Sequence, residues 1–162
     1  MRIGLPAGIA TLLFAAFIVT PAHAQQRRLP PAPRITLDEA KRAVDAAEAE
    51  ARQHGWNLAF VIADAEGVPI YLRRMDGVPT RNYEVAMNKI RTVITSGMHT
   101  VDYAAAVQAG RIQPIEGALT YEGGLLLRRG GQIVGAFSAS GASGAQDAQA
   151  VRAGMAVIGI EP

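Results

Sequence analysis

The sequence contains no cysteine, and this absence excludes several kinds of chemistry at once. No disulfide can form, no thiolate can act as nucleophile or metal ligand, and no cysteine can carry a lipid anchor. Histidine is scarce too, since only His54 and His99 lie outside residues 1–24. Neither their separation nor the acids near them give a recognised ligand spacing, so we expect no metal site built from side chains.

Long hydrophobic runs are missing as well. The run from Ile9 to Val19 follows Arg2 and is well short of the roughly 20 apolar residues that cross a bilayer. It is followed by Ala22-His23-Ala24, and this order is typical of a secretory signal peptide. We therefore predict cleavage after Ala24, no stable membrane anchor, and a periplasmic or secreted protein.

Charge of one sign is not in excess. Removing residues 1–24 from 162 leaves 138 residues, with fifteen basic and fourteen acidic side chains and a formal charge of +1. This balance predicts no nucleic-acid binding, and the length suits one domain with one core. Residues 25–35 are rich in proline and arginine and are interpreted as a solvated segment that precedes a domain over residues 36–162.

Apolar residues at helical spacing, and short apolar runs between turn residues, divide this domain. Helices are expected at about 36–54, 80–96, 101–109 and from 146 onward, and strands at 57–64, 68–73, 118–128 with a break at Gly123-Gly124, and 132–138. Thr36 with Glu39 and Thr100 are expected to cap the first and third helices. Pro69 cannot donate a ladder hydrogen bond and favours an edge strand. The order predicts an α+β sandwich with an antiparallel sheet of about five strands flanked by helices.

Three groups of residues carry a family resemblance. They are the turn Asp64-Ala65-Glu66-Gly67, the helical stretch from Tyr83-Glu84 to Lys89, and the double glycine Gly123-Gly124 followed by the segment from Gly135 to Ala142. Together they resemble the small haem-binding or haem-degrading family that includes the glycolate-operon protein G and the secreted haem-binding protein of streptomycetes. The resemblance implies a profilin-like fold, haem as the cofactor, and a homo-oligomer, with octamers among the possible assemblies.

The chain also departs from this family pattern. Ile90 and Ser138 stand where the family usually has alanine and glycine, and Ala118 stands where some haem-binding relatives have a threonine near the metal. The fold tolerates these changes, but no axial iron ligand can be transferred from the relatives.

The candidate haem contacts are therefore side chains with suitable chemistry. A neutral imidazole or a phenolate can bind haem iron, so His99 and Tyr121 are the first candidates, with Thr120 and Glu122 as further ones. Lys89 is a candidate partner for a haem propionate. Simpler interpretations remain open: a partly exposed loop histidine, an aromatic that packs in a strand, and a solvated helix face.

A second candidate site is the loop that precedes the last helix. The backbone N–H groups around Ser140, Gly141, Ser143 and Gly144 could bind a phosphate or carboxylate at the positive end of the helix dipole. Alternatively, Ser143 and Gln146 form a capping box that uses the same donors, and Asp147 repels an anion.

The leading functional hypothesis is an exported haem-binding protein, with haem degradation as a further activity. The sequence shows no reductant site or bound iron, so it does not decide whether the protein is an enzyme. An enzyme or binding protein for a small organic acid is the second hypothesis. A non-catalytic accessory or assembly subunit is the third.

Overall fold

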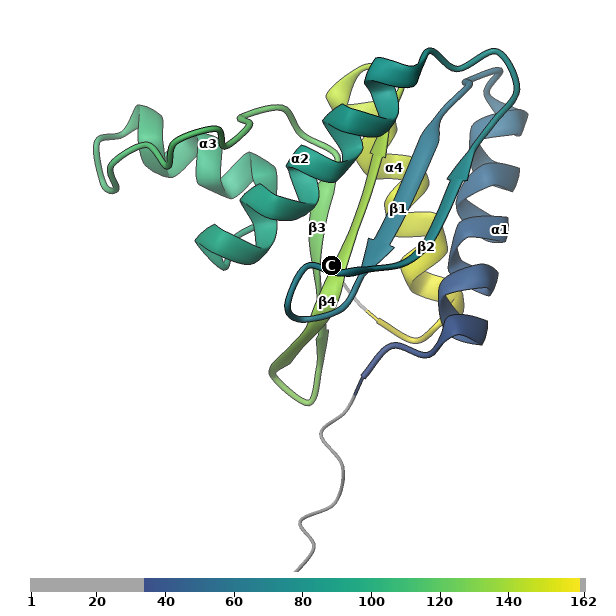
Figure 1. Ribbon diagram of the computed structural model, residues 1–162, viewed down its shortest axis with the longest axis horizontal. Helices are drawn as coiled ribbons and strands as arrows, with labels where there is room; N and C mark the ends of the chain where they lie inside the picture. Colours follow the sequence, from purple (N-terminus) through teal and green to yellow (C-terminus); the bar gives the residue numbers. More distant parts are fainter. Residues whose placement is uncertain (1–33, 161–162) are drawn as a thin grey trace, which may run out of the picture. The chain divides into compact units, whose positions relative to one another are not determined.

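Eight helices and strands follow one another along residues 34–160, the part of the chain that the computed structural model describes (Figure 1). The predicted signal peptide and most of the proline- and arginine-rich segment lie outside these residues. None of the helices within residues 34–160 is long and apolar enough to span a bilayer. In order, the elements are α1 (Leu37–Gln53), β1 (Ala59–Ala63), β2 (Pro69–Arg74), α2 (Thr80–Ser96), α3 (Thr100–Gln108), β3 (Gly124–Arg129), β4 (Gln132–Ser140) and α4 (Gly144–Val157).

The sheet has four strands in the order β2-β1-β4-β3, and every neighbouring pair is antiparallel. The central strand β1 is buried over its whole length, as its continuous apolar sequence predicts. Pro69 begins the edge strand β2, which confirms the position expected from its missing N–H group. The α+β class and the antiparallel sheet are thus confirmed.

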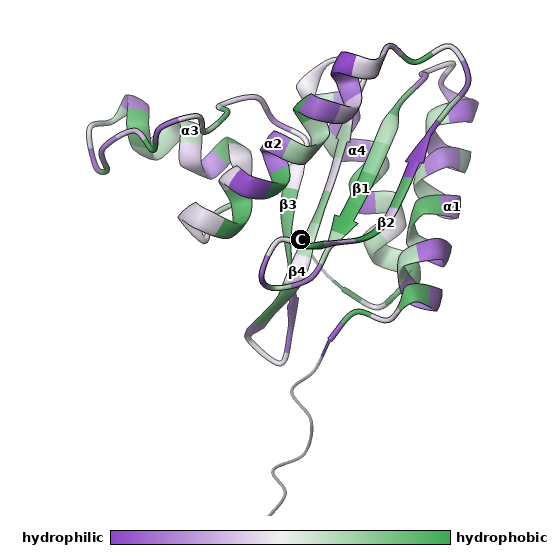
Figure 2. Cartoon of the chain, viewed as in Figure 1, coloured by the Kyte–Doolittle hydropathy of each residue, from purple (hydrophilic) through white to green (hydrophobic). Residues whose placement is uncertain are grey.

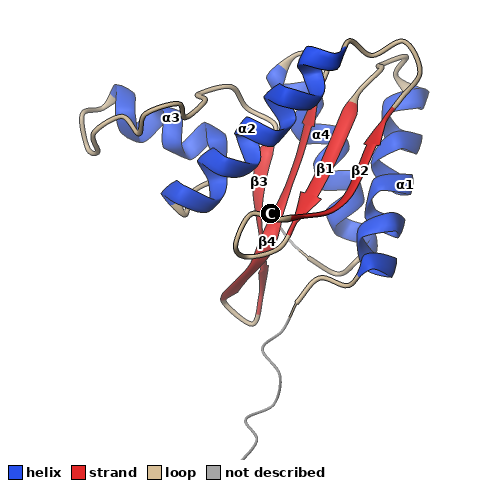
Figure 3. Cartoon of the chain, in the orientation of Figure 1, coloured by secondary structure: helices blue, strands red, loops and turns tan. Residues whose placement is uncertain are grey.

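The sheet has four strands where about five were expected, and the strand expected at 118–128 is shorter, because residues 118–123 form a loop (Figure 3). The backbone N–H of Leu119 donates to Thr92 Oγ1 at 2.8 Å, so it pairs with a helix side chain and not with a strand. Gly117 and Gly123 at either side have positive φ angles of 73° and 109°, which extended strands do not use. The strand therefore begins only at Gly124.

Helices cover both faces of the sheet: α1 and α4 pack together on one face and α2 on the other (Figure 1). Small residues let α1 and α4 come close, since a side chain at Gly154 would meet the carbonyl oxygen of Ala43. The hydrophobic residues of the strands and of the inner helix faces form the core between these layers (Figure 2). This packing explains the alanine-rich stripe in the sequence of α1.

The helix caps agree with the sequence at two of three ends. Capping boxes join Thr36 to Glu39 at the start of α1 and Ser143 to Gln146 at the start of α4. The expected cap at Thr100 was wrong: His99 is the N-cap residue of α3, and no side chain caps this helix. The hydroxyl of Thr100 bonds to the backbone of β3 instead, which matters for the site described below.

Candidate functional site

A cavity of about 300 Å³ opens where the start of α3, the Gly123-Gly124 segment and α4 meet. Its walls include His99, Glu122 and Arg152. Sequence separations of more than twenty residues lie between these three side chains, so only the fold brings them together. The cavity thus contains two of the side chains that the sequence nominated for haem contact.

His99 is held in this cavity by the edge of the sheet. Its Nδ1 atom accepts a hydrogen bond of 3.0 Å from the backbone N–H of Leu126 in β3. Burial lowers the pKa of His99, the charges of Arg128 and Arg152 lower it further, and Asp102 raises it. The imidazole is therefore neutral near pH 7.

Thr100 bonds to the same edge of β3 at Gly124, two residues before Leu126. The N–H of Gly124 donates to Thr100 Oγ1 at 3.1 Å, and the hydroxyl donates to the carbonyl of Gly124 at 3.2 Å. Residues two apart in a strand direct their N–H groups to the same side of the strand. The side chains of His99 and Thr100 therefore take the place of a neighbouring strand, because they accept the hydrogen bonds of Leu126 and Gly124 at the free edge of β3. This pairing covers an edge that would otherwise be open to other chains.

A buried ion pair lies behind the double glycine. Lys89 Nζ is 2.8 Å from Asp147 Oδ2 and also donates to the carbonyl of Ala139, and the two charged residues are 1% and 2% exposed. Asp147 Oδ1 accepts from the N–H of Ala142 at 3.1 Å. Burial lowers the pKa of Lys89 and raises that of Asp147, while the charge of each partner opposes the shift of the other.

Gly123 is required beside this pair for two reasons. Its φ of 109° is in the region that favours glycine, and a Cβ atom there would lie 2.6 Å from Asp147 Cβ and 2.7 Å from Lys89 Nζ. The backbone can therefore lie against the ion pair only because position 123 has no side chain. The Lys89–Asp147 pair thus packs directly against Gly123 and Gly124, which form the glycine wall of the cavity.

The remaining nominated residues differ in their surroundings. Glu122 lies 3.5 Å from Arg152 across the cavity, and the two residues that precede it, Thr120 and Tyr121, are exposed, Tyr121 by 63%. Lys89 is not open to a propionate, because its ammonium group is buried and bound to Asp147.

Several backbone donors in and beside the loop around Ser140, Gly141, Ser143 and Gly144 bond within the chain. Besides the N–H of Ala142, which donates to Asp147, the N–H of Ser143 donates to Gln146 Oε1 at 3.0 Å, and the N–H of Gln146 donates to Ser143 Oγ. This is the capping arrangement that the sequence left open as the alternative to anion binding.

Three functional features escaped sequence reasoning. Arg152 lies one helical turn after Ala148, and the i,i+4 spacing could have placed it on the same wall of the cavity. The salt bridge between Lys89 and Asp147 joins residues 58 positions apart, for which a single sequence gives no signal. A second cavity of about 510 Å³ lies between α2 and residues 115–118 and includes Ala118. Over residues 34–160, no three histidine or acidic side chains gather closely enough to hold a metal ion.

Comparison with known families agrees with this arrangement of motifs. The family described as "Haem degrading protein HbpS-like" matches residues 35–156, which include every element from α1 to most of α4. The chain belongs to this HbpS-like family. The match confirms the resemblance inferred from the glycine motifs and from the stretch between Tyr83 and Lys89.

Individual members of the HbpS-like family and related structures also match most of the chain. Protein GlcG of Escherichia coli is 33% identical over 99 residues, covering 60% of this chain and 74% of GlcG. The crystal structure of a double mutant of Streptomyces reticuli HbpS superposes with a TM-score of 0.73 at 30% identity, covering 86% of this chain and 97% of that chain. A crystal structure of a PduOC:heme complex has the same fold, with a TM-score of 0.71 at 24% identity, covering 79% and 97%.

Proposed function

We propose that the protein binds haem at the cavity formed by the start of α3, the double glycine and α4. One observation carries the proposal: in a chain of the HbpS-like haem degrading family, His99 lines one cavity together with the distant segment Glu122-Gly123-Gly124.

The surface around the cavity suits a large, flat, mostly apolar ligand. Val101 lines the cavity and is 42% exposed, and Tyr121 next to Glu122 is 63% exposed. Exposed apolar and aromatic side chains in or beside a cavity favour a ligand that removes them from water. Since the cavity is smaller than a porphyrin, one edge of the macrocycle enters it and the rest lies against Val101 and Tyr121.

Polar groups for the ends of such a ligand are also present. The phenol of Tyr121 is our first candidate for the iron, because phenolate ligates ferric haem in some proteins. Glu122 and Thr120 follow as oxygen donors. Arg152 replaces Lys89 as the candidate propionate partner, because it lines the cavity and is 44% exposed in its side chain.

Titration of the purified protein with haemin tests this function. We expect a saturable shift of the Soret band, which Tyr121→Phe moves and weakens, because the phenolate oxygen is lost. Tyr71→Phe is the matched control, since Tyr71 lies on β2 and its hydroxyl bonds to Arg73. A Soret response that is equal in wild type and Tyr121→Phe would contradict the proposed iron ligand.

The same preparation separates the alternative functions. Loss of the Soret band with ascorbate and oxygen would indicate haem degradation, and a persistent band would indicate binding alone. No haemin response, together with a rise in melting temperature on adding a small carboxylate, would favour the organic-acid hypothesis. An absence of both responses would favour an accessory subunit.

Export and assembly complete the proposal. We propose cleavage after Ala24 and a symmetric homo-oligomer whose contacts cover exposed apolar side chains such as Val68 and Leu72. Mass spectrometry of the exported fraction should find a chain that begins at Gln25, and intact Met1 would contradict the cleavage. Light scattering that gives a stable monomer at micromolar concentration would contradict the assembly.

A further inference from the structure

We infer that His99 meets the ligand of this cavity as a hydrogen-bond donor, through Nε2–H to a carboxylate oxygen, and not as an iron ligand. The inference rests on the proposed cavity, but it concerns the proton on one imidazole ring and can be tested without haem.

The argument begins with the fixed partner of Nδ1. The N–H of Leu126 can only donate, so Nδ1 must present its lone pair, at a distance of 3.0 Å. A neutral imidazole with a lone pair on Nδ1 carries its proton on Nε2. The neutral form is favoured here because burial lowers the pKa of His99.

This tautomer conflicts with iron binding. A neutral histidine that ligates a metal through Nε2 holds its proton on Nδ1 and donates it to an acceptor. At Nδ1 the structure offers a donor, the N–H of Leu126, in place of an acceptor. Ligation through Nε2 would therefore break this bond and leave the edge of β3 open at Leu126.

The Nε2–H group is open to an acceptor brought by a ligand. Among residues 34–160, Nδ1 of His99 has its partner in Leu126, and the structure gives Nε2 none. Arg152 is the second donor of the cavity, and its contact with Glu122 is long at 3.5 Å between partly exposed side chains. A ligand carboxylate could thus replace Glu122 at Arg152 and accept from His99.

The charges of the walls explain why a directed donor is needed. Arg152 is positive, and Asp102 and Glu122 are negative, so net charge alone does not attract an anion to the cavity. A carboxylate gains its affinity here from two aimed hydrogen bonds. Such a carboxylate is either a haem propionate or a free small organic acid.

The first test measures the tautomer directly in the ligand-free protein. Two-dimensional NMR of protein with ¹⁵N-labelled histidine should show the Nε2–H form for His99. His54 is an internal reference, because its ring is partly exposed, stacks on Trp56 and does not line the cavity. A proton on Nδ1 of His99 at neutral pH would overturn the inference.

The second test separates a donor from an iron ligand. His99→Gln keeps an acceptor for Leu126 and a donor for the ligand, so haemin affinity should stay within about threefold with the Soret maximum unchanged. His99→Phe removes both groups and should weaken haemin binding about tenfold or more, again with the Soret maximum unchanged. A moved Soret maximum in His99→Gln would show iron ligation and overturn the inference.

Two ligand arms identify the source of the carboxylate. If it is a propionate, methylation of both propionates should weaken haemin binding to wild type more than it weakens haemin binding to His99→Phe, which keeps only the donor of Arg152. If it is a free acid, glycolate or oxalate should raise the melting temperature of wild type and His99→Gln more than that of His99→Phe. Should haemin not bind, the proposed function fails while the tautomer and the small-acid arm still decide this inference. An equal response of His99→Phe and wild type in both arms would overturn it.

Discussion

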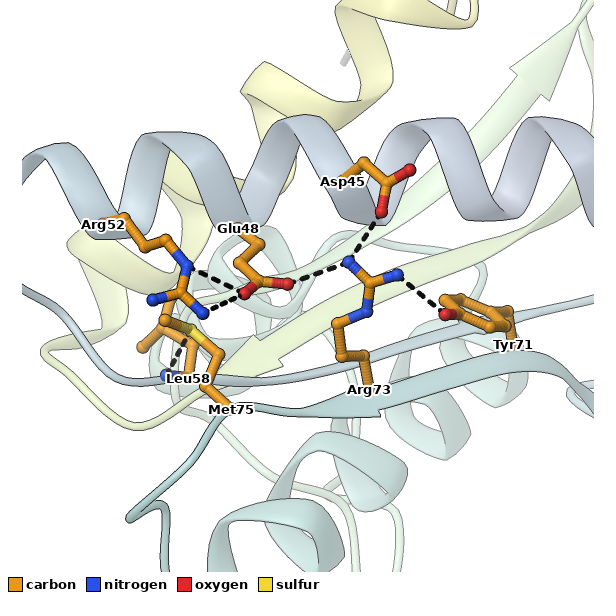
Figure 4. A network of polar contacts seen from close by, with 7 residues as sticks. All are labelled: Asp45, Glu48, Arg52, Leu58, Tyr71, Arg73 and Met75. Carbon is orange, nitrogen blue, oxygen red and sulfur yellow. Dashed lines mark hydrogen bonds and ion pairs between the residues drawn. The ribbon is translucent and has the colours of Figure 1, made fainter.

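Two charged clusters of this protein place similar side chains in different surroundings. Lys89 and Asp147 form a pair between α2 and α4 that is almost completely buried. At the outer edge of the sheet, between β2 and α1, Arg73 contacts Asp45 at 2.6 Å, Glu48 at 2.8 Å and the hydroxyl of Tyr71 at 2.8 Å (Figure 4). The first cluster contacts the glycine wall of the cavity, and the second joins an edge strand to a helix.

The two clusters differ in their exposure to solvent. A buried charge has lost its hydration, so each partner of the Lys89–Asp147 pair depends on the other. Water reaches the network of Arg73, where the side chain of Asp45 is 59% exposed, so each charge there keeps part of its hydration. We therefore expect the buried pair to respond strongly to the loss of one partner and the outer network to respond weakly.

The strongest test of this comparison is Lys89→Met. The variant leaves the carboxylate of Asp147 buried without its cation, so the free energy of unfolding should fall by about 3–5 kcal/mol. Urea denaturation followed by circular dichroism measures the change. A loss below about 1 kcal/mol would mean that the pair is not buried as the structure describes.

Adding Asp147→Leu to Lys89→Met sharpens this result. The second substitution removes the unpaired charge, and replacing a whole buried pair by apolar residues is often neutral. Recovery should be partial, because the N–H of Ala142 then loses its acceptor. A double variant that is less stable than Lys89→Met alone would contradict the electrostatic explanation.

The next largest effect is expected at the glycine beside the pair. Gly123→Ala combines an unfavourable φ of 109° with contacts of 2.6 and 2.7 Å to the pair, so it should cost about 2–4 kcal/mol. Gly77→Ala is the matched control: its φ is 77°, but no heavy atom lies within 4 Å, so it should cost about 1 kcal/mol. Equal losses in the two variants, measured by urea denaturation, would show that close contact with the pair is unimportant.

A smaller effect is expected at the outer cluster. Arg73→Ala should lower the free energy of unfolding by about 1 kcal/mol, and less at high salt, because the network is solvated and screened. Arg74→Ala is the control on the other face of β2, where the side chain bonds to Thr80 at 3.1 Å. Thermal unfolding at low and high salt measures both variants. A loss at Arg73 that equals that of Lys89→Met would contradict the comparison.

Local patterns predicted most of the fold. The helix at 80–96 was predicted with the bounds of α2, and the capping boxes at Thr36 and Ser143 were predicted correctly, because each depends on residues within four positions. The loop at 118–123 was missed because its backbone is held by Thr92, which lies far away in sequence. Local propensity cannot report such a distant hydrogen-bond partner.

The candidate site was predictable in its residue types but not in its chemistry. The sequence nominated His99 and Glu122, which do line one cavity. It could not show that the N–H of Leu126 donates to Nδ1 of His99, or that the carboxylate of Asp147 binds the ammonium group of Lys89. Both facts depend on contacts between elements that only the folded chain brings together.

The smallest expected effect distinguishes the two clusters by pH. Burial alone would raise the pKa of Glu48, but hydrogen bonds from Arg73 and Arg52 outweigh it and hold the pKa below the ordinary value of 4.5. Glu48 therefore contributes stability above about pH 4.5 and loses it as the pH falls through its lowered pKa. The raised pKa of Asp147 has the opposite sign, because the folded state binds that proton first as the pH falls.

Urea denaturation of wild type and Glu48→Gln between pH 7 and pH 3 checks this sign. The difference in unfolding free energy should be below about 1 kcal/mol at pH 7, because the network is solvated. It should shrink further below pH 4.5, since the wild-type carboxylate then takes up a proton and resembles the amide of the variant. Glu84→Gln, at an exposed position of α2, controls for the general loss of a negative charge. The opposite result is a difference between Glu48→Gln and wild type that grows on acidification. It would mean that Arg73 and Arg52 do not hold Glu48 as a carboxylate. The outer cluster would then no longer differ from the buried pair in its response to pH.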